Sequence, residues 1–403
     1  MKDIKIFLAV CAAAVCILLI TGCEQRFDTS SLPSPSQVTN PGDTSYVEVY
    51  PPWGGFGSPI AVMIGNDQLI YVCDYENNEV VMLDQGGTVL SRRHVMHPIS
   101  IAQNSKLDLY VGGEAISPNG IDTIGAIYRI YLARFDTNYI ARYDTVIQFG
   151  DTIITPEIRD TSYFANHHLD SAHARIVWGE QSHPARRFRG IAIMPDNSWL
   201  TARYGPNNTS FVDPDCRVLR FNANDTSDVF LTPVGDLITE PSGGTAITDI
   251  RYLTGIMIFP GSRNFLLTQK TDGVVYGAVQ MTYTKNAIVE GWSPTYDPAD
   301  PNTRGADIIR PYRFRNAVAA AYDKTRREIF ILDTDLDSVM KFTNNGRFKT
   351  ESFGRYITGS QGFPALNGPM GIAFSSDCTL YISDTGNKVI RRFKLSTQTQ
   401  CIK

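Results

Sequence analysis

Short apolar segments recur along most of this chain, separated by clusters of Gly, Asn, Asp, Ser and Thr. The clearest example is GPMGIAFSSDCTLYISDTGNKVIRRFK at residues 368–394, where three apolar segments follow one another. Because the separators are rich in turn-forming residues, the pattern predicts an antiparallel meander of three short strands.

The same order of segments occurs six times. The copies open with SPIAV, HPISI, RGIAI, TGIMI, NAVAA and MGIAF, which start at Ser58, His97, Arg189, Thr254, Asn316 and Met370. Each second segment closes at a defined position: Asp74, Gly113, Arg203, Lys270, Asp333 and Asp384. A single meander cannot bury both of its faces, so the copies must stack. We therefore expect an all-β, six-bladed β-propeller of four-stranded antiparallel blades.

The two ends of the repeat region predict how the ring closes. No apolar segment follows the last copy after Lys394, whereas Tyr46 to Tyr50 forms one ahead of the first copy. We expect this N-terminal strand to complete the last blade. Small residues at the start of the first strands fit a crowded axis. An open β-solenoid is the competing architecture.

The last copy resembles the NHL repeat, whose pattern is P-x-G-I-A followed by L-Y-V-x-D-x-x-N-x-x-I. The residues at the matching places are Pro369, Gly371, Ile372, Ala373, Leu380, Tyr381, Asp384, Asn387 and Ile390. The resemblance extends from Tyr46 to Lys394, close in copies one, five and six and poor in copies two, three and four. It implies an NHL-like propeller in which the Asp that closes the second strand has a structural, loop-capping role.

The N-terminus predicts a targeting signal followed by a linker. Lys2 and Lys5 precede an apolar run, and the boundary ITGC resembles a bacterial lipobox, which implies a signal peptide at 1–22 and acylation of Cys23. Residues 23–45 then form a lipidated, flexible stalk with a reach of about 25 Å. This predicts an outer-membrane lipoprotein whose partner is the membrane, on the periplasmic or the surface side. An ordinary signal peptide or single membrane anchor is the alternative.

The body then covers residues 46–403 as one propeller domain. Its second copy is interrupted by a large insertion, about residues 114–187, which is too long for a plain loop and predicts a decoration on one face. The formal net charge of −4 argues against a nucleic-acid partner. In a compartment that permits disulfides, Cys378 and Cys401 are the most plausible pair among Cys73, Cys216, Cys378 and Cys401. Four unpaired thiols are the alternative.

Metal or cofactor chemistry has little support in the sequence. Six-bladed relatives include lactonases with a divalent cation at the axis and lyases with a His-bound metal. The residues that open the first strands here contain no Asp or Glu and only one His, too few ligands for calcium or zinc. His167, His168, His173 and His183 match no zinc motif, and the alternating acids Asp333, Asp335 and Asp337 lack the Gly and distal Glu of a calcium loop. We expect no metal and no cofactor.

Cations gather instead in the poorly matching copies. In copies three and four the loop-capping Asp is replaced by Arg203 and Lys270, and Arg189 opens copy three. Arg315 approaches from copy five, and His97 opens copy two. We predict a face that is basic at blades three and four and acidic at blades five, six and one, where a carboxylate, a sulfated or uronic sugar, or an acidic protein loop would bind. Solvated charges on degenerate blades are the alternative.

Exposed aromatics near the same loops are candidate stacking surfaces: Trp53, Phe56, Tyr204, Tyr252 and Tyr312. Together these features predict a ligand- or protein-binding, or scaffolding, module with an unknown protein or glycan partner. A hydrolase or lyase with its site at the channel mouth is the alternative, and a structural subunit of an outer-membrane assembly is a third.

Overall fold

The computed structural model describes residues 45–132, 142–148, 151–157, 169–206, 213–226, 238–239, 243–288, 290–354 and 365–397. Every strand belongs to one compact unit, Thr44–Lys403. The predicted signal peptide, Cys23 and the predicted stalk up to residue 44 lie outside the described residues. Within those residues, no helix is both long enough and apolar enough to cross a membrane.

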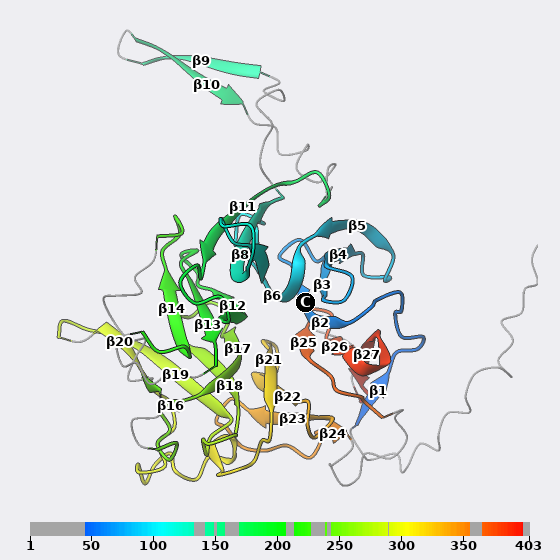
Figure 1. Cartoon of the computed structure of the whole chain (residues 1–403), viewed down its shortest axis with the longest axis vertical. Helices are drawn as coiled ribbons and strands as arrows, with labels where there is room; N and C mark the ends of the chain where they lie inside the picture. Colours follow the sequence, from blue (N-terminus) through cyan, green and yellow to red (C-terminus); the bar gives the residue numbers. More distant parts are fainter. Residues whose placement is uncertain are drawn as a thin grey trace, which may run out of the picture. The chain divides into compact units, whose positions relative to one another are not determined.

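Six antiparallel sheets surround a common centre (Figure 1). From the inside outward, blade one contains β2 (Pro59–Ile64), β3 (Ile70–Asp74), β4 (Glu79–Leu83) and β5 (Val89–His94). Blade two contains β6 (Met96–Gln103), β7 (Leu109–Ile116), β8 (Thr123–Tyr131) and β11 (His173–Gly179). Blade three contains β12 (Arg187–Ile193), β13 (Trp199–Tyr204) and β14 (Arg217–Phe221). Blade four contains β17 (Tyr252–Ile258), β18 (Phe265–Lys270), β19 (Ala278–Lys285) and β20 (Glu290–Pro294). Blade five contains β21 (Ala317–Asp323), β22 (Glu328–Asp333), β23 (Ser338–Thr343) and β24 (Phe353–Gly354). Blade six contains β25 (Gly371–Phe374), β26 (Leu380–Asp384), β27 (Val389–Leu395) and β1 (Tyr46–Glu48). The predicted six-bladed propeller is confirmed; blade three has three strands within the described residues.

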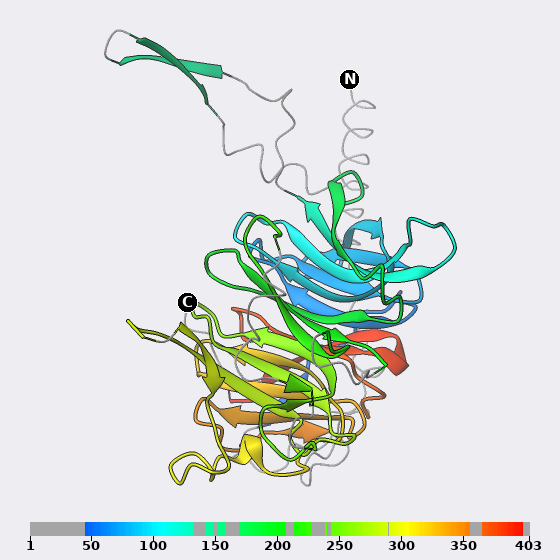
Figure 2. The same cartoon turned by 60° about the vertical axis from the view of Figure 1, so that its left-hand side comes forward.

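The ring is closed twice. Along the axis, each innermost strand contacts the innermost strands of both neighbouring blades, including β25 of the last blade with β2 of the first. At the outer edge, β1 pairs with β27 in the register Tyr46↔Leu395 to Glu48↔Phe393. The N-terminal strand therefore completes the last blade, as predicted. Figure 2, turned by 60° from the view of Figure 1, shows the sheets of neighbouring blades stacked as successive layers.

The second strand of each blade lies between two neighbours and is covered on both faces. Every residue of β3, β22 and β26 is buried. This explains why these strands are continuous apolar segments in the sequence rather than alternating ones, because a strand buried on both faces has no polar side. Their side chains form clusters that span adjacent blades, such as the one joining Phe330 and Leu332 to Ile382 and Tyr46.

The insertion in blade two is shorter than the predicted range 114–187. Residues up to Tyr131 complete β8, and His173–Gly179 form the outer strand β11, which pairs with β8. The interruption is thus confined to the stretch between these strands, which contains the antiparallel hairpin β9 (Arg142–Gln148) and β10 (Asp151–Glu157). The remaining elements are the short parallel pair β15 (Ile238–Thr239) and β16 (Asp249–Ile250) and two 3₁₀ turns, η4 (Asp307–Ile309) and η5 (Thr385–Asn387).

Glycines permit the close approach of innermost strands at the axis. A Cβ on Gly371 would lie 2.6 Å from the carbonyl oxygen of Ile60 and 2.9 Å from Cα of Ala61, both in the backbone of blade one. A Cβ on Gly255 would lie 2.7 Å from the carbonyl oxygen of Val318, and one on Gly190 would lie 2.6 Å from the amide nitrogen of Ile256. Since these neighbours are backbone atoms, they cannot turn aside as a side chain would. The small residues predicted at the axis are required for this reason.

The Asp that closes the second strand holds the loop leading into the first strand. Asp74 accepts hydrogen bonds from the amides of Gly57 and Ser58 at 2.8 and 2.7 Å. In blade five, Asp333 accepts the amides of Arg315 and Asn316 at 2.7 and 3.1 Å. In blade six, Asp384 accepts that of Asn367 at 2.8 Å. These three carboxylates are wholly buried, and their role is structural, as predicted.

Replacing Gly371 with Ala should destabilise the ring. The added methyl group would force the last blade away from the first, which corresponds to overpacking that costs about 1–3 kcal/mol. Chemical denaturation should show this loss of unfolding free energy. Gly291→Ala is the matched control, because a Cβ at Gly291 meets nothing within 4 Å. Equal stability of the two variants would contradict this account of the axis.

Candidate functional site

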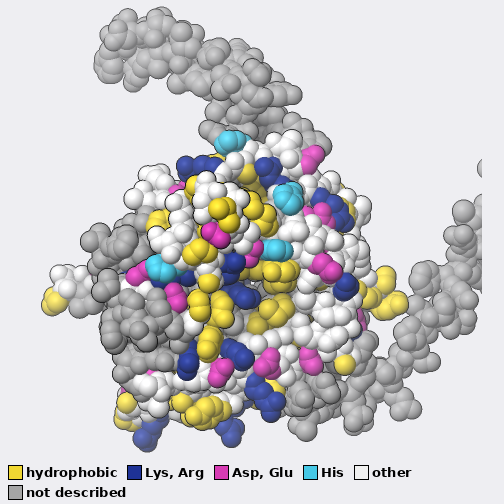
Figure 3. All heavy atoms as spheres, viewed as in Figure 1, with side chains coloured by type: hydrophobic (Ala, Val, Ile, Leu, Met, Phe, Trp, Pro, Cys, Tyr) yellow, Lys and Arg dark blue, Asp and Glu magenta, His cyan; other side chains and the backbone are white. Residues whose placement is uncertain are grey.

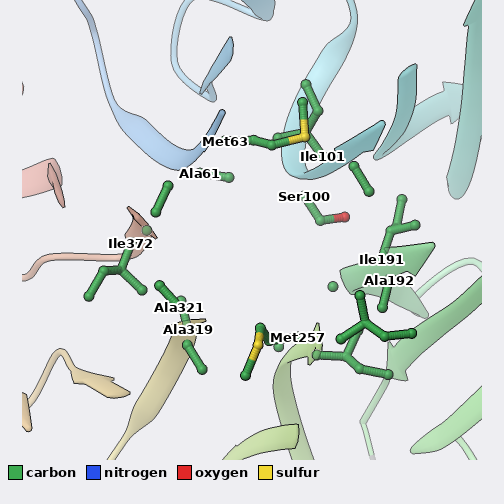
Figure 4. Close-up of a pocket in the computed structure, with 18 of the residues that line it drawn as sticks. Ala61, Met63, Ser100, Ile101, Ile191, Ala192, Met257, Ala319, Ala321 and Ile372 are labelled. Atoms are coloured by element: carbon green, nitrogen blue, oxygen red, sulfur yellow. The ribbon is translucent and has the colours of Figure 1, made fainter. Parts of the chain in front are cut away.

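A cavity of about 870 Å³ lies at the centre of the ring and is lined by the innermost strands of all six blades (Figure 4). Its volume falls within the roughly 300–1,000 Å³ typical of small-molecule sites. The lining residues are mostly aliphatic along the strands. Charged residues are few: Arg189, Lys270 and Asp272.

The strand pairing defines one level of this cavity. In blades one to five the innermost strand shifts register near its start, and regular pairing resumes at Ala61, Ser100, Gly190, Gly255 and Ala319. In blade six, pairing begins at Gly371. The residues immediately before these positions all line the cavity, and we call them the mouth ring: Ile60, Ile99, Arg189, Thr254, Val318 and Met370. A β-bulge re-aims a side chain in this way at many functional sites.

The mouth ring differs from the ring expected from the sequence. The repeat alignment placed Ser58, His97 and Asn316 at the level of Arg189, whereas the register places Ile60, Ile99 and Val318 there. The innermost strands of blades one to five contain bulge residues that a repeat pattern does not reveal. Arg189 therefore lies in a more apolar setting than predicted, because its aligned neighbours in three blades are aliphatic.

Arg189 is therefore the one charged member of the mouth ring. Its side chain is partly buried, and within the part of the chain that the structure describes it forms no ion pair. Its guanidinium carbon lies 5.4 Å from the centre of the Tyr204 ring, close enough for a cation–π contact. Burial lowers the pKa of Arg189 below the ordinary arginine value, although the side chain stays protonated. A desolvated cation without a carboxylate partner is costly unless an anion compensates it.

Aromatic rings extend from Arg189 along the mouth. Tyr204 and Tyr252 line the cavity, and their ring centres are 6.0 Å apart. Tyr252 also lies beneath Arg251, whose guanidinium carbon is 5.2 Å from the ring centre. On the face shown in Figure 3, cationic and hydrophobic side chains adjoin each other near the centre of the ring. The other predicted aromatics differ: Trp53 and Phe56 are buried in packing, and Tyr312 is exposed outside the cavity lining.

Lys270 is the second cation at the cavity. It is exposed at the end of β18 and forms an isolated backbone bridge to Asn316. The register of blade four aligns Gln269, not Lys270, with the loop-capping Asp of other blades. Gln269 takes over that role, since its Oε1 accepts the amide of Arg251 at 3.0 Å. Lys270 is thereby left at the surface, with Asp272 as the nearby acid of the lining.

Arg203 lies inside blade three, not at the channel. Its side chain is 2% exposed, and it pairs with Glu180 at 2.8 Å and Asp213 at 2.7 Å. Arg186 shares both acids and also pairs with Asp215 at 2.8 Å. This network replaces the capping Asp, so the guanidinium of Arg203 has a structural role within the blade. Its position does not support the predicted ligand contact.

His97 and Arg315 also lie outside the cavity lining of the described residues. His97 stacks on Tyr75 at 4.5 Å, and its Nδ1 lies 2.9 Å from a Glu114 oxygen. Burial raises the pKa of the Glu114 carboxyl. The hydrogen bonds with His97 and Arg187 outweigh this effect, so that the pKa lies below its ordinary value. Arg315 has an exposed side chain, and its amide belongs to the Asp333 cap.

The predicted charge gradient is not built as expected. The Asp residues that close the second strands of blades one, five and six are Asp74, Asp333 and Asp384, and all three are wholly buried beneath the entry loops. Carboxylates that accept backbone amides inside the protein contribute little to a surface field. What remains at the cavity is a local positive charge on blades three and four, from Arg189 and Lys270.

Other candidate sites resolve in different ways. The described residues contain no group of three or more His, Cys, Asp or Glu side chains placed to hold a metal; His167 and His168 lie outside those residues. Asp335 accepts the side-chain amide of Asn316 at 3.0 Å, as in turn chemistry. Cys73 and Cys216 are buried and are not part of a disulfide. Cys378 is disulfide-bonded, and because Cys401 lies outside the described residues, the pairing of these two stays a prediction.

Comparisons with known proteins place the fold but not the family. No family model matches the chain, and no curated protein matches it. The resemblance to the NHL repeat and the lipoprotein assignment therefore stay predictions.

Solved structures with similar folds are distant in sequence. An auxiliary nutrient binding protein from Bacteroides ovatus aligns with 88% of this chain and 78% of its own, at a TM-score of 0.56 and 12% identity. One from Bacteroides thetaiotaomicron aligns with 85% of this chain and 70% of its own, at a TM-score of 0.51 and 12% identity. A putative gluconolactonase aligns with 88% of this chain and 93% of its own, at a TM-score of 0.50 and 12% identity. Two binding proteins and a protein named as an enzyme thus share this fold, and the fold alone does not show whether this chain binds a ligand or catalyses a reaction.

Replacing Arg203 with Met should destabilise the protein without weakening a ligand at the channel. The change leaves Glu180 and Asp213 with one cation fewer, and breaking a buried ion pair typically costs about 3–5 kcal/mol. Urea denaturation measures the loss. Arg304→Met, at an exposed position, is the control and should change the unfolding free energy by less than about 0.5 kcal/mol. A stable Arg203→Met protein would show that the network is not needed for the fold.

Proposed function

We propose that this protein is a binding module with its site at the mouth of the central channel, where an anionic ligand contacts Arg189 and Lys270. The observation that carries the proposal is Arg189, a partly buried cation in a ring of mostly apolar residues, without an ion pair among the described residues. Arg203, His97 and Arg315 were also predicted to contact the ligand, but they are not part of this site because none of them lines the cavity.

The neighbours of Arg189 support a ligand rather than a purely structural role. The buried Arg186 and Arg203 have acids placed against them, whereas Arg189 lies over the face of Tyr204 and forms no ion pair with any described residue. An anion there would form charge-assisted hydrogen bonds worth about 1.5–3 kcal/mol. Lys270 would add longer-range attraction, and Asp272 would oppose it, so the local balance still favours an anion.

A second candidate is a hydrolase or lyase, and one observation favours it. His97 is oriented by Glu114 through Nδ1, and its other ring nitrogen makes no hydrogen bond among the described residues. A histidine held in this way by a carboxylate is a common general base. However, it lies outside the cavity lining, so a substrate would have to extend beyond the mouth.

Arg189→Gln should abolish most of the affinity for an anion. Titration calorimetry with acetate, octanoate, glucuronate, glucose 6-sulfate and hexaglutamate should find a binder whose affinity falls about 10–100-fold in the variant, as expected for one lost charge-assisted contact. Lys270→Gln should cost less, and Asp272→Asn should tighten binding slightly.

Arg304→Gln is the matched control, because this exposed arginine does not line the cavity. If every anion bound Arg189→Gln as tightly as the parent protein, the proposal would fail. The same samples decide the second candidate: ligand recovered as hydrolysed or eliminated product supports an enzyme, and ligand recovered unchanged contradicts it for that compound.

We also propose that the chain is an NHL-like lipoprotein held at the outer membrane through Cys23, with the propeller beyond a flexible stalk. The lipobox-like sequence ITGC and the polar stretch after it support this placement. Metabolic labelling with a palmitate analogue should mark the parent protein and not Cys23→Ser. Equal labelling of both would refute acylation at this residue.

A further inference from the structure

Below the mouth ring, few of the side chains that line the cavity can form a hydrogen bond with a ligand. Figure 4 labels ten of its lining side chains: Ala61, Met63, Ser100, Ile101, Ile191, Ala192, Met257, Ala319, Ala321 and Ile372. Only Ser100 among them carries an oxygen, and its hydroxyl donates to the carbonyl of Phe188 at 2.7 Å. Thr254, in the mouth ring, likewise donates to the carbonyl of Ala317. These hydroxyls bind the next blade and are not offered to a ligand.

Several polar side chains at other parts of the lining already form hydrogen bonds within the protein. The Gln103 Oε1 accepts the amide of Asn66 at 2.6 Å, and the Asn66 side chain donates to the carbonyl of Asn104 at 3.0 Å. Ser105 donates to the Asn197 Oδ1 at 2.9 Å. A polyol drawn into the channel would leave hydroxyl groups unsatisfied, at a cost of about 1–3 kcal/mol each. An alkyl or aryl group would lose nothing on entering.

We propose that the ligand is an amphipathic monoanion, with its charged group at Arg189 and its apolar body in the channel below. This inference rests on the proposed function and deepens it by naming the ligand class. The net charge of the charged lining residues, Arg189, Lys270 and Asp272, is +1, which one anionic group neutralises. The apolar body would contact Ile101, Ile191, Met257, Ala319 and Ile372, side chains that come from five different blades.

The separation of the two parts of the site makes the ligand class specific. Arg189 sits one residue above Gly190, where regular pairing resumes, so the charge and the aliphatic strand lie directly one after the other along β12. A small hydrophilic anion would use the cation and leave the channel to water. A neutral hydrocarbon would use the channel and leave the cation uncompensated. Only a molecule that has both parts uses the whole cavity.

The test is a chain-length series on the mature chain from residue 23 carrying Cys23→Ser, so that neither an acyl group nor detergent competes. Straight-chain carboxylates from butyrate to dodecanoate are titrated by calorimetry below their micelle-forming concentrations. Each added methylene that enters the channel should tighten binding about fourfold, until the chain fills the cavity. The 1-alkanol of each length should bind at least about tenfold more weakly than the carboxylate.

Two sets of variants separate the head and the tail. Arg189→Gln should erase the preference for carboxylate over alkanol but keep the dependence on chain length. Ala319→Leu or Ala61→Leu, each checked for an unchanged melting transition, should shorten the longest chain that still gains affinity. Ile288→Ser is the control for non-specific binding, because Ile288 is 93% exposed on the surface, and it should leave the series unchanged.

The outcomes are distinguishable. If glucuronate or hexaglutamate binds through Arg189 while carboxylate affinity is independent of chain length, the ligand class is overturned and the proposed function stands. If no anion binds in an Arg189-dependent manner, both fall. If alkanols bind as tightly as carboxylates, the channel is a neutral apolar pocket and the inference is overturned. If Ile288→Ser weakens the series, the binding lies on the surface and the inference is equally overturned.

Discussion

The closure of six innermost strands around one axis governs this molecule. Three of those strands approach the next blade so closely that only glycine fits: a methyl group on Gly190, Gly255 or Gly371 would lie 2.6 or 2.7 Å from backbone atoms of that blade. The strand β1 then joins the last blade to the start of the chain. Once the ring is closed, the side chains on the inner strands have nowhere to point except into the packing or into the channel. The chemistry of the cavity is therefore set by what those strands carry.

Within this arrangement, the arginines of blade three show how position decides role. Arg186 and Arg203 are buried and form ion pairs with Glu180, Asp213 and Asp215. These ion pairs stabilise the blade at the position where blades one, five and six have a loop-capping Asp. Arg189, two residues after the first residue of β12, lies in a bulge and lines the channel, and within the described part of the chain it forms no ion pair. Arg186 and Arg203 are therefore structural and Arg189 faces the channel, although all three are the same residue type.

Much of the architecture could be predicted from the sequence, because apolar segments and turn residues repeat with each blade. The number of blades, the closing strand and the small residues at the axis follow from that periodicity. The site could be predicted only in part. Arg189 and Lys270 stood out as departures from the repeat, and both line the cavity. Arg203 stood out for the same reason but is buried, since its partners Glu180 and Asp213 lie outside any repeat position. The bulges that set the level of Arg189 leave no mark in an apolar pattern, so Ile60, Ile99 and Val318 were missed.

The most direct test of the central claim is a crystal structure of the protein with 12-bromododecanoate, located by the anomalous signal of bromine. We expect a carboxylate within hydrogen-bond distance of the Arg189 guanidinium and a bromine peak inside the channel, among Met257, Ala319 and Ile372. A bromine peak on the outer surface, or a carboxylate held by other residues with Arg189 still unpaired, would contradict it.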